Sequence, residues 1–244
     1  MASLDTILVD SLEEVVQAVD ALSASTSIAV DLEGINLGRQ GRACIMQLFS
    51  EGSGTIYLVD LTVLGHVAFD TPNEAGESLR SILEGEGIRK VFWDVRNDSD
   101  ALHYHYQVDL RNCFDLQVLE VFGRRSRGET SRCVNGLAKS MSLYGIASWQ
   151  WTSVKDAGAK LFAPEQGGRY EVFEERPLDS RLVQYCAQDV GLMFKLEAAI
   201  RRKCYGILDT SISRETEARV RASKAFHYNG KGRHMALATF SSWN

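Results

Sequence analysis

Residues 27–34 read Ser-Ile-Ala-Val-Asp-Leu-Glu-Gly, an apolar run that carries two carboxylates. If this run is a β-strand, its side chains alternate between the faces of the sheet, so Asp31 and Glu33 share one face. Two carboxylates a few ångströms apart repel each other unless a cation joins them, and a hard divalent cation is the simplest partner. An apolar strand ending in two acids can also occur without a metal. The metal interpretation therefore depends on acids supplied elsewhere in the chain.

The residues on either side of this run predict a helix and a meander of strands. Ser11 and Glu14 have the spacing of a capping box, and apolar residues follow them at helical spacing. After the 27–34 strand, two β-rich runs are separated by a glycine-containing loop, at 43–49 and 55–60. We therefore expect a helix followed by three antiparallel strands.

The next part of the chain alternates between strand and helix patterns. Strands are predicted over 88–93 and 112–114, and helices over 75–85, 97–106, 115–122 and 133–143. This alternation is typical of parallel strands joined by helices, so the fold class is α/β, with a mixed sheet flanked by helices. Residues 144–180 are expected to be mostly irregular.

The C-terminal part is helical and basic. Residues 180–202 have the apolar spacing of one long amphipathic helix, on which Tyr185 and Asp189 lie one turn apart and face the same point. A basic helix over 214–226 and a mobile tail follow. Residues 201–244 contain nine Lys or Arg and three Asp or Glu, in a chain of net charge −5. This basic excess can follow a phosphate backbone, or it can form a solvated helix face.

The composition is that of an ordinary globular chain, with 244 residues of which 45% are hydrophobic. We expect no membrane association, because the sequence has no apolar window of about eighteen residues and no secretory signal pattern. Five cysteines without a Cys-x-x-Cys pair argue against a disulfide framework or a zinc site. They predict an intracellular protein, in cytoplasm or nucleus.

Four acids from three separate elements can form one site if helices pack over the end of the sheet. Asp98 at the head of a helix and Asp189 on a late helix would then join Asp31 and Glu33. Cleaving a phosphodiester requires an oxygen nucleophile and relief of negative charge, and two cations about 4 Å apart supply both. Carboxylates suit Mg²⁺ or Mn²⁺, and Tyr185 can orient the water. The sequence therefore predicts a two-cation site.

The order Asp31-x-Glu33, Asp98, Tyr185-x-x-x-Asp189 resembles the three motifs of the DEDD 3′–5′ exonucleases, in the subgroup with tyrosine in the third motif. Other segments are similar to the ribonuclease D-related branch, and most to Egalitarian-like exonuclease domains: DLEGINLGR at 31–39, DVRNDS at 94–99, FDLQ at 114–117, KLFAP at 160–164, ERPL at 175–178 and YCAQDV at 185–190. The resemblance predicts an exonuclease domain over 5–203, followed by a basic C-terminal helix and tail over 204–244.

The resemblance implies an RNase H-like mixed sheet with the active site at one end of the sheet. In such enzymes Asp31, Glu33 and Asp189 would hold the cation that activates water, Asp31 and Asp98 would hold the second, and Tyr185 would position the nucleophile. The polarity of cleavage, from the 3′ end, and the preference for RNA are implied by the family alone.

The second motif leaves a choice between two acids. Asp98 is the first choice because it falls within the first turn of the predicted helix, and Asp94 is the second. Related proteins often have histidine where Trp93 stands. Trp93, Asp94 and Arg39, which lies just beyond the acidic strand, are also candidates for substrate contact.

Several other residues have plain structural explanations. His103 and His105 diverge on a helix, so we expect packed or surface histidines and not a shared metal. Asp115 is expected to be a helix N-cap. Trp149 and Trp151 can stack on bases, although packing in the core is the preferred interpretation. Further candidates for phosphate contact are Arg124, Arg125, Arg127 and Arg132.

The leading hypothesis is a metal-dependent 3′–5′ exonuclease that acts on single-stranded RNA, with DNA as the alternative substrate. Some members of this branch have lost their acids and serve as RNA-binding adaptors, so a binding module with a vestigial site is the second hypothesis. The presence of all four acids and Tyr185 favours the enzyme. The expected partner is nucleic acid, and no protein partner is indicated.

Overall fold

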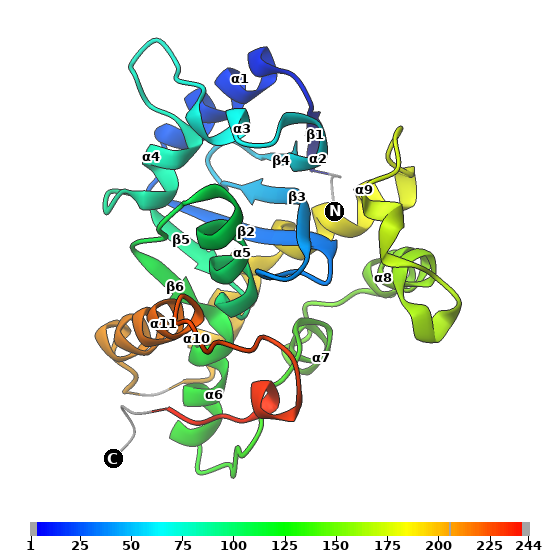
Figure 1. The fold of residues 1–244 in the computed structure, drawn as a ribbon. Helices are drawn as coiled ribbons and strands as arrows, with labels where there is room; N and C mark the ends of the chain where they lie inside the picture. The colour runs from blue at the N-terminus through cyan, green and yellow to red at the C-terminus, as the bar shows by residue number, and fades with distance from the viewer. Residues whose placement is uncertain (1–3, 205, 241–244) are drawn as a thin grey trace.

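The computed structural model describes residues 4–204 and 206–240 of the chain. In this range one mixed sheet (Figure 1) has the strand order β1 (Asp5–Val9), β4 (Thr55–Asp60), β3 (Arg42–Phe49), β2 (Ser27–Ile35), β5 (Arg89–Phe92) and β6 (Cys113–Asp115). β2, β3 and β4 form an antiparallel meander, whereas β1 pairs with β4, β5 with β2, and β6 with β5 in parallel. The predicted α/β class with a mixed sheet is confirmed.

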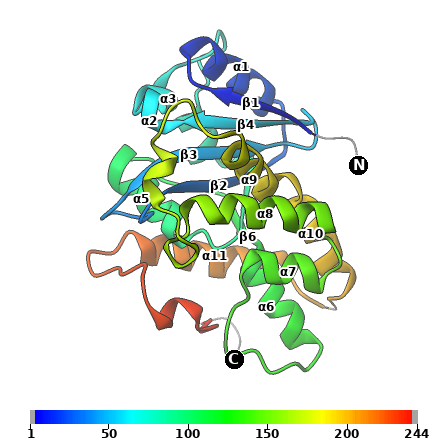
Figure 2. The same ribbon diagram turned by 90° about the vertical axis from the view of Figure 1, so that its right-hand side faces the viewer.

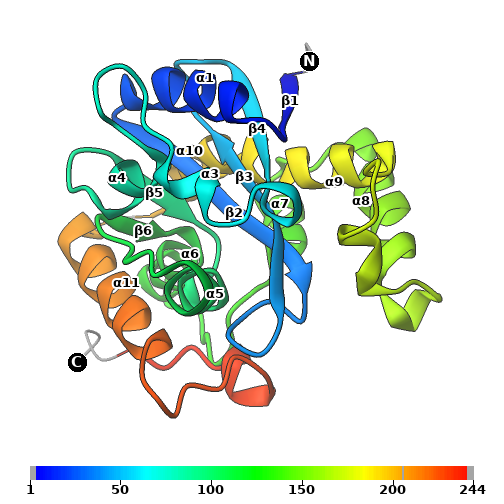
Figure 3. The same ribbon diagram turned by 45° about the horizontal axis from the view of Figure 1, so that its top comes forward.

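Helices cover both faces of the sheet (Figures 1 and 3). One face packs against α1 (Leu12–Ser23), α2 (Leu61–Leu64), α3 (Val67–Asp70), α4 (Leu79–Glu84) and α5 (Arg96–Tyr106). The other packs against α6 (Leu116–Ser126), α7 (Leu137–Leu143), α8 (Trp149–Phe162), α9 (Ser180–Gly191) and α10 (Met193–Arg202). The 3₁₀ helices η1 (Pro164–Gln166) and η2 (Tyr170–Phe173) connect α8 to α9.

The last elements lie beside β6. α11 (Asp209–Ser223) contacts β6, α5 and α6, and the short 3₁₀ helix η3 (Arg233–Ala236) follows it. Figure 1 shows the segment after α11 passing below α5 and returning toward α6. None of the helices in the described residues is both long and apolar enough to span a membrane.

The alternation of side chains along β2 divides the core. Val30 and Leu32 belong to the cluster packed against α1, α4 and α5, whereas Ala29 belongs to the cluster packed against α6, α9 and α10. Side chains two residues apart on a strand point the same way, so Asp31 and Glu33 follow Ala29. The two acids therefore face the α9 side of the sheet.

The end of β5 makes room for these acids. β5 pairs with β2 only at Ser27, Ile28 and Ala29, and the chain then turns into α5 while β2 continues. The register of β2 and β3 shifts at Gly34, where an added Cβ would lie 2.0 Å from the carbonyl oxygen of Arg42. Only glycine fits that close approach, so the sequence at 34 fixes the bend that follows the acidic pair.

The structure corrects the predictions in the C-terminal half. Residues 144–180 are not mostly irregular, because they contain the regular helix α8, capped by the Ser148 side chain, together with the 3₁₀ helices η1 and η2. The single helix predicted over 180–202 is broken at Leu192, which follows Gly191, a poor helix former packed against Ile56 of β4. The expected mobile tail is folded against the protein through residue 240, and its last four residues lie outside the described range.

Smaller corrections concern the ends of elements. Residues 5–9 form an edge strand, β1, that was not predicted, and its outer residues are exposed, which weakens the apolar pattern. The helices predicted over 75–85, 133–143 and 214–226 occupy Leu79–Glu84, Leu137–Leu143 and Asp209–Ser223. The three strands of the meander lie where they were predicted, within two residues at each end.

Candidate active site

Three predicted acids come together at the end of β5. Asp31 and Glu33 from β2 and Asp189 from α9 each offer a carboxylate oxygen, and these oxygens lie within 4.8 Å of one another. Asp189 is buried and the two strand acids are partly buried. Figure 2 shows α9 packed across the strands, which is how a residue 156 positions after Glu33 reaches it. The fold thus brings together three of the four acids that were predicted to share one site.

Burial and mutual repulsion make these carboxyl groups reluctant to ionise. Burial raises the pKa of Glu33 to about 8, with a further contribution from the charge of Asp189. Burial also raises the pKa of Asp31 well above its usual value, and the charges of Asp98, Asp189 and Glu33 add to it. The pKa of Asp189 is raised by burial as well. Such a group of acids binds either protons or a cation.

Asp98 lies next to this group, at the head of α5. Its side chain is 4% exposed, and its Oδ1 has no hydrogen-bond partner among the residues that the structure describes. Burial and the charges of Asp94 and Glu33 raise its pKa well above the usual value. Asp94, by contrast, is paired with Arg96 at 2.5 and 2.6 Å. Of the two acids considered for the second motif, Asp98 is therefore the one with a free oxygen beside the site.

Tyr185 lies one turn before Asp189 on α9. Its hydroxyl hydrogen-bonds to Glu33, which opposes part of the rise in the pKa of Glu33. Burial and the nearby charges of Glu33 and Asp189 raise the pKa of the phenol above its usual value, so it stays protonated. Its ring packs edge-on against Phe162 at 5.0 Å between centroids. The hydroxyl is thus directed into the acidic group.

Lys155 of α8 is a residue that sequence reasoning missed. Its Nζ donates to both carboxylate oxygens of Asp189 at 2.6 Å and lies 3.2 Å from the centroid of the Tyr185 ring. Its positive charge lowers the pKa values of Asp31, Glu33 and Asp189, which opposes the effect of burial. The site therefore contains one built-in cation of its own.

A signal for α8 was present in the sequence. Ser148 is a favoured N-cap residue, and Trp151, Val154, Gly158 and Leu161 recur at the spacing of an amphipathic helix. Gly158 faces α9, where an added Cβ would come within 2.6 Å of the Tyr185 side chain. Lys155 lies on the same side of α8 as Gly158, less than one turn away, and therefore also faces α9.

The donor set fits divalent cations that prefer oxygen. Three carboxylates gather within 4.8 Å, and Asp98, whose charge raises the pKa of Asp31, presents a buried oxygen that a protein group does not satisfy within the described residues. A buried polar atom without a partner is costly, and a cation bound beside Asp98 would satisfy this oxygen. Mg²⁺ and Mn²⁺ take carboxylate oxygens in preference to softer ligands.

The residues predicted to touch substrate are held by the protein itself. Arg39 donates to Asp100 at 2.7 Å and to the carbonyl oxygens of Ser223, the last residue of α11, and of Phe226 just after it. Trp93 is 8% exposed within the core, and Asp94 is paired with Arg96. These contacts position the loop after β2 and the head of α5 beside the acids.

Other predicted residues divide between core and surface. Trp151 is buried and Trp149 is 80% exposed, so only Trp149 remains available to stack on a base. His103 pairs with Asp109, and His105 contacts the carbonyl of Gly38. Asp115 is an N-cap, as expected. The arginines of the 124–132 region are engaged with the protein where contacts are described: Arg124 with Glu120, Arg125 with Ser131 and Ala238, and Arg127 with Glu129.

Comparisons with known proteins place the chain among nucleases. A family model described as a 3′–5′ exonuclease matches residues 6–204. The piRNA biogenesis protein EXD1 of Homo sapiens is 28% identical over 187 residues, covering 76% of this chain and 34% of that protein. The chain thus spans about a third of the length of this curated relative.

Solved structures share the fold. Trypanosoma brucei RNase D in complex with GMP superposes with a TM-score of 0.78 at 22% identity, over 96% of this chain and 69% of that one. The same protein in complex with RNA U12 gives a TM-score of 0.74 at 22% identity, over 97% and 77%. The mixed sheet and its helices are therefore an arrangement of the RNase D type.

Proposed function

Because this chain belongs to the 3′–5′ exonuclease family, whose model matches residues 6–204, we propose that it shortens single-stranded RNA from the 3′ end with the help of two divalent cations. Members of this family are hydrolases that act on phosphodiester bonds. The observation that carries the proposal is the gathering of Asp31, Glu33 and Asp189 within 4.8 Å, with the unpartnered oxygen of Asp98 beside them.

In this proposal Asp31, Glu33 and Asp189 would hold one cation, and Asp31 and Asp98 would hold the other. When bound, Mg²⁺ or Mn²⁺ supplies Lewis-acid charge that lowers the pKa of water and offsets the charge on the scissile phosphate. The surrounding fold buries these acids wholly or partly away from bulk water and fixes the directions of their side chains. This arrangement requires the carboxyl groups to release the protons that their raised pKa values retain in the absence of metal.

Tyr185 and Lys155 act on the reacting groups. The protonated Tyr185 hydroxyl, beside Glu33, orients the water that attacks phosphorus. As the water oxygen bonds to phosphorus it gives up one proton to solvent, the bond from phosphorus to the 3′ oxygen breaks, and this leaving oxygen takes up one proton from solvent. The Lys155 ammonium pairs with Asp189 in the free protein, and its donors turn to a phosphate oxygen when substrate enters.

The choice of RNA rests on similarity to Trypanosoma brucei RNase D, solved with RNA U12, and to EXD1 proteins named for piRNA biogenesis. The adaptor hypothesis has one observation in its favour: Lys155 contacts both oxygens of Asp189, where a cation would have to bind. A lysine that is not displaced would leave a site that binds nucleic acid without cleaving it.

A matched pair of oligonucleotides tests the proposal. We expect a 5′-labelled single-stranded RNA to give a ladder that shortens from the 3′ end with Mg²⁺ or Mn²⁺, and the DNA of the same sequence to be cut more slowly. Asp31→Asn keeps the shape but removes the charge, and should abolish the ladder. Binding by both proteins with no shortening by either would support the adaptor, and equal cutting of the DNA would overturn the RNA preference.

A further inference from the structure

α11 lies outside the residues that the family model matches, yet it contacts α5, whose head carries Asp98. We propose that Arg219 of α11, acting through Asp115, positions Asp98 toward the acidic group. Arg219 is a positioning residue in this inference, which rests on the proposed function only in assigning Asp98 to the site. The family match ends near residue 204, but the elements that hold the site extend beyond it.

Asp115 joins two helix heads. Its Oδ1 accepts the N–H groups of Asp94 and Gln117, each at 2.9 Å, and its Oδ2 accepts that of Val95 at 3.2 Å. The contact with the N–H of Gln117 caps α6, whereas the contacts with Asp94 and Val95 hold the turn that leads into α5. Asp115 is fully buried, so this carboxylate serves the protein interior and not solvent.

The turn before α5 needs such support. Asp94 has a φ of 66°, in the left-handed region that residues other than glycine rarely adopt. The carbonyl of Val95 accepts the N–H of Ser99 at 2.8 Å, which closes the first turn around Asp98. The peptide groups fixed by Asp115 are therefore the ones that set the direction of Asp98.

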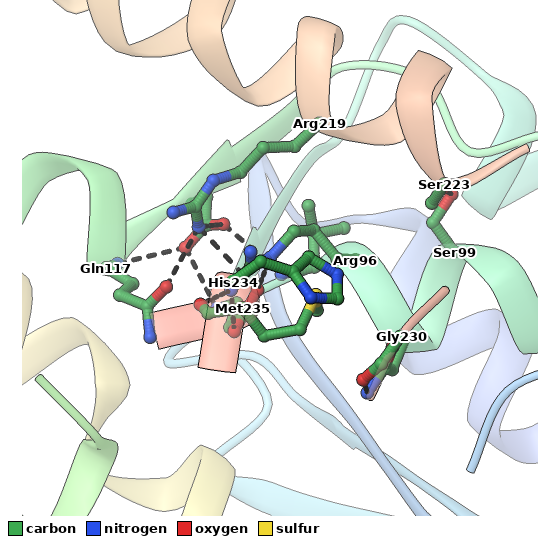
Figure 4. A network of polar contacts seen from close by, with 12 residues as sticks. Arg96, Ser99, Gln117, Arg219, Ser223, Gly230, His234 and Met235 are labelled. Carbon is green, nitrogen blue, oxygen red and sulfur yellow. Dashed lines mark hydrogen bonds and ion pairs between the residues drawn. The ribbon is translucent and has the colours of Figure 1, made fainter. Parts of the chain in front are cut away.

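Arg219 makes this arrangement electrostatically possible. Its Nη1 donates to Asp115 Oδ2 at 2.6 Å and to Gln117 Oε1 at 3.0 Å, from a side chain that is itself buried (Figure 4). A buried carboxylate is costly unless it is hydrogen-bonded and paired with a positive group, and Arg219 supplies that group here. Without Arg219, the carboxylate of Asp115 would lack this partner, and the turn that it holds would be less firmly fixed.

Two further contacts from the same face of α11 support α5 and β6. Thr216 accepts the backbone N–H of Asp115 at 3.1 Å, and Ser223 Oγ lies 2.9 Å from the Oγ of Ser99, the neighbour of Asp98. Figure 4 shows Ser223 beside Ser99 on one side of the network and Arg219 reaching Gln117 on the other. One helix face thus holds both sides of the Asp98 turn.

The test uses binding of Mn²⁺ alone by the full chain, measured by calorimetry, together with thermal unfolding. Partners that orient metal ligands typically affect metal affinity by 10-fold to 100-fold, so we expect Arg219→Met to weaken Mn²⁺ binding by about 10-fold or more. Arg219→Lys, which keeps the charge, should recover part of the loss. Arg221→Met, on the exposed side of the same helix, is the matched control and should bind Mn²⁺ like the wild type.

A second variant guards against loss of the fold. Arg219→Met leaves a buried carboxylate without its partner, whereas the double change Asp115→Asn with Arg219→Gln removes both charges and keeps a polar side chain at each position. We expect the double variant to unfold close to the wild-type temperature but to bind Mn²⁺ about 10-fold more weakly, because an amide oxygen cannot accept all three N–H groups. Wild-type Mn²⁺ affinity in this folded double variant would overturn the inference.

The outcome can be separated from that of the proposed function. A wild-type protein that binds Mn²⁺ but cuts no RNA would overturn the hydrolase and leave the role of Arg219 open to the same binding measurement. An Asp98→Asn protein that binds Mn²⁺ like the wild type would overturn the assignment of Asp98 to the site, and with it the role of Arg219.

Discussion

The two helices that bring acids to β2 are held by different kinds of charge pair. At the head of α5, buried Asp115 is bound by backbone N–H groups and by Arg219 at 2.6 Å. On α9, the carboxylate of Asp189 is contacted by Lys155, whose Nζ lies 2.6 Å from each oxygen. The first pair connects several elements of the fold, whereas the second lies inside the site.

Arginine and lysine suit these two tasks. A guanidinium offers planar, fixed donors, and is favoured in buried pairs that hold geometry. An ammonium on a flexible four-carbon stem is a compact charge that can change partners. We therefore expect loss of Arg219 alone, on the α5 side, to lower stability together with metal binding, and changes on the α9 side to alter rate or metal binding in a protein that stays folded.

The largest expected effect on the α9 side comes from Tyr185→Phe, which keeps the ring and removes the hydroxyl beside Glu33. If that hydroxyl orients the water, the rate of RNA shortening should fall by about 10²-fold or more, as for a positioned catalytic group, while Mn²⁺ affinity and unfolding temperature change little. Single-turnover cleavage and calorimetry measure the two quantities. Unchanged turnover would remove Tyr185 from the mechanism.

A smaller effect is expected from Lys155→Met, which removes the built-in cation but keeps a long apolar side chain. Mn²⁺ should bind about tenfold more tightly, because a like charge within a few ångströms opposes the ion by on the order of 1 kcal/mol or more. Without metal, the variant should unfold at a lower temperature because the acids lose a counter-ion. Lys160→Met, on the exposed side of α8, is the control. Weaker Mn²⁺ binding by Lys155→Met would show that the lysine supports the ion and does not compete with it.

The smallest expected effect is a pH dependence of the metal-free protein. The pKa of Glu33 is about 8 in the folded chain, against a usual value of 4.5. Between these values the folded state keeps a proton that the unfolded chain releases, so the free energy of unfolding falls as pH rises. We expect the unfolding temperature in EDTA to drop by about 5 °C from pH 5 to pH 8, a shift of roughly 1–3 kcal/mol for a chain of this size.

Glu33→Gln should reduce the fall of the unfolding temperature with pH, because the amide does not titrate. Glu13→Gln, on the exposed face of α1, should leave that fall unchanged. Saturating Mg²⁺ should remove the fall, because a cation takes the place of the proton. A metal-free protein that grows more stable toward pH 8 would contradict the raised pKa of Glu33.

The central strands and the acids were predictable because each rests on a local pattern. Alternation along 27–34 placed Asp31 and Glu33 on one face, and helical spacing placed Tyr185 and Asp189 on one stripe. The site also depends on the order of the strands, because β5 must end at Ala29 of β2 for Asp98 to reach the acids. Spacing along the chain does not contain that order, and the family resemblance supplied it.

The residues that sequence reasoning missed act through contacts between distant elements. Lys155 looks like any lysine on an amphipathic helix until α8 is packed on α9. Arg219 looked like part of a basic surface, yet it is buried against Asp115, 104 positions away. Charge counting over 201–244 could not separate a solvated arginine from an interior one, because both contribute the same charge to the sum.

The close packing of α8 on α9 at Gly158 has an evolutionary consequence. An added methyl group at this position would meet the Tyr185 ring at 2.6 Å, so even alanine there would push the phenol away from Glu33. A related protein could thus lose its nuclease activity through substitution of this one glycine while every acidic motif stays intact. A survey of the carboxylates alone would then classify an inactive relative as an active nuclease, whereas the residue at position 158 would reveal the loss.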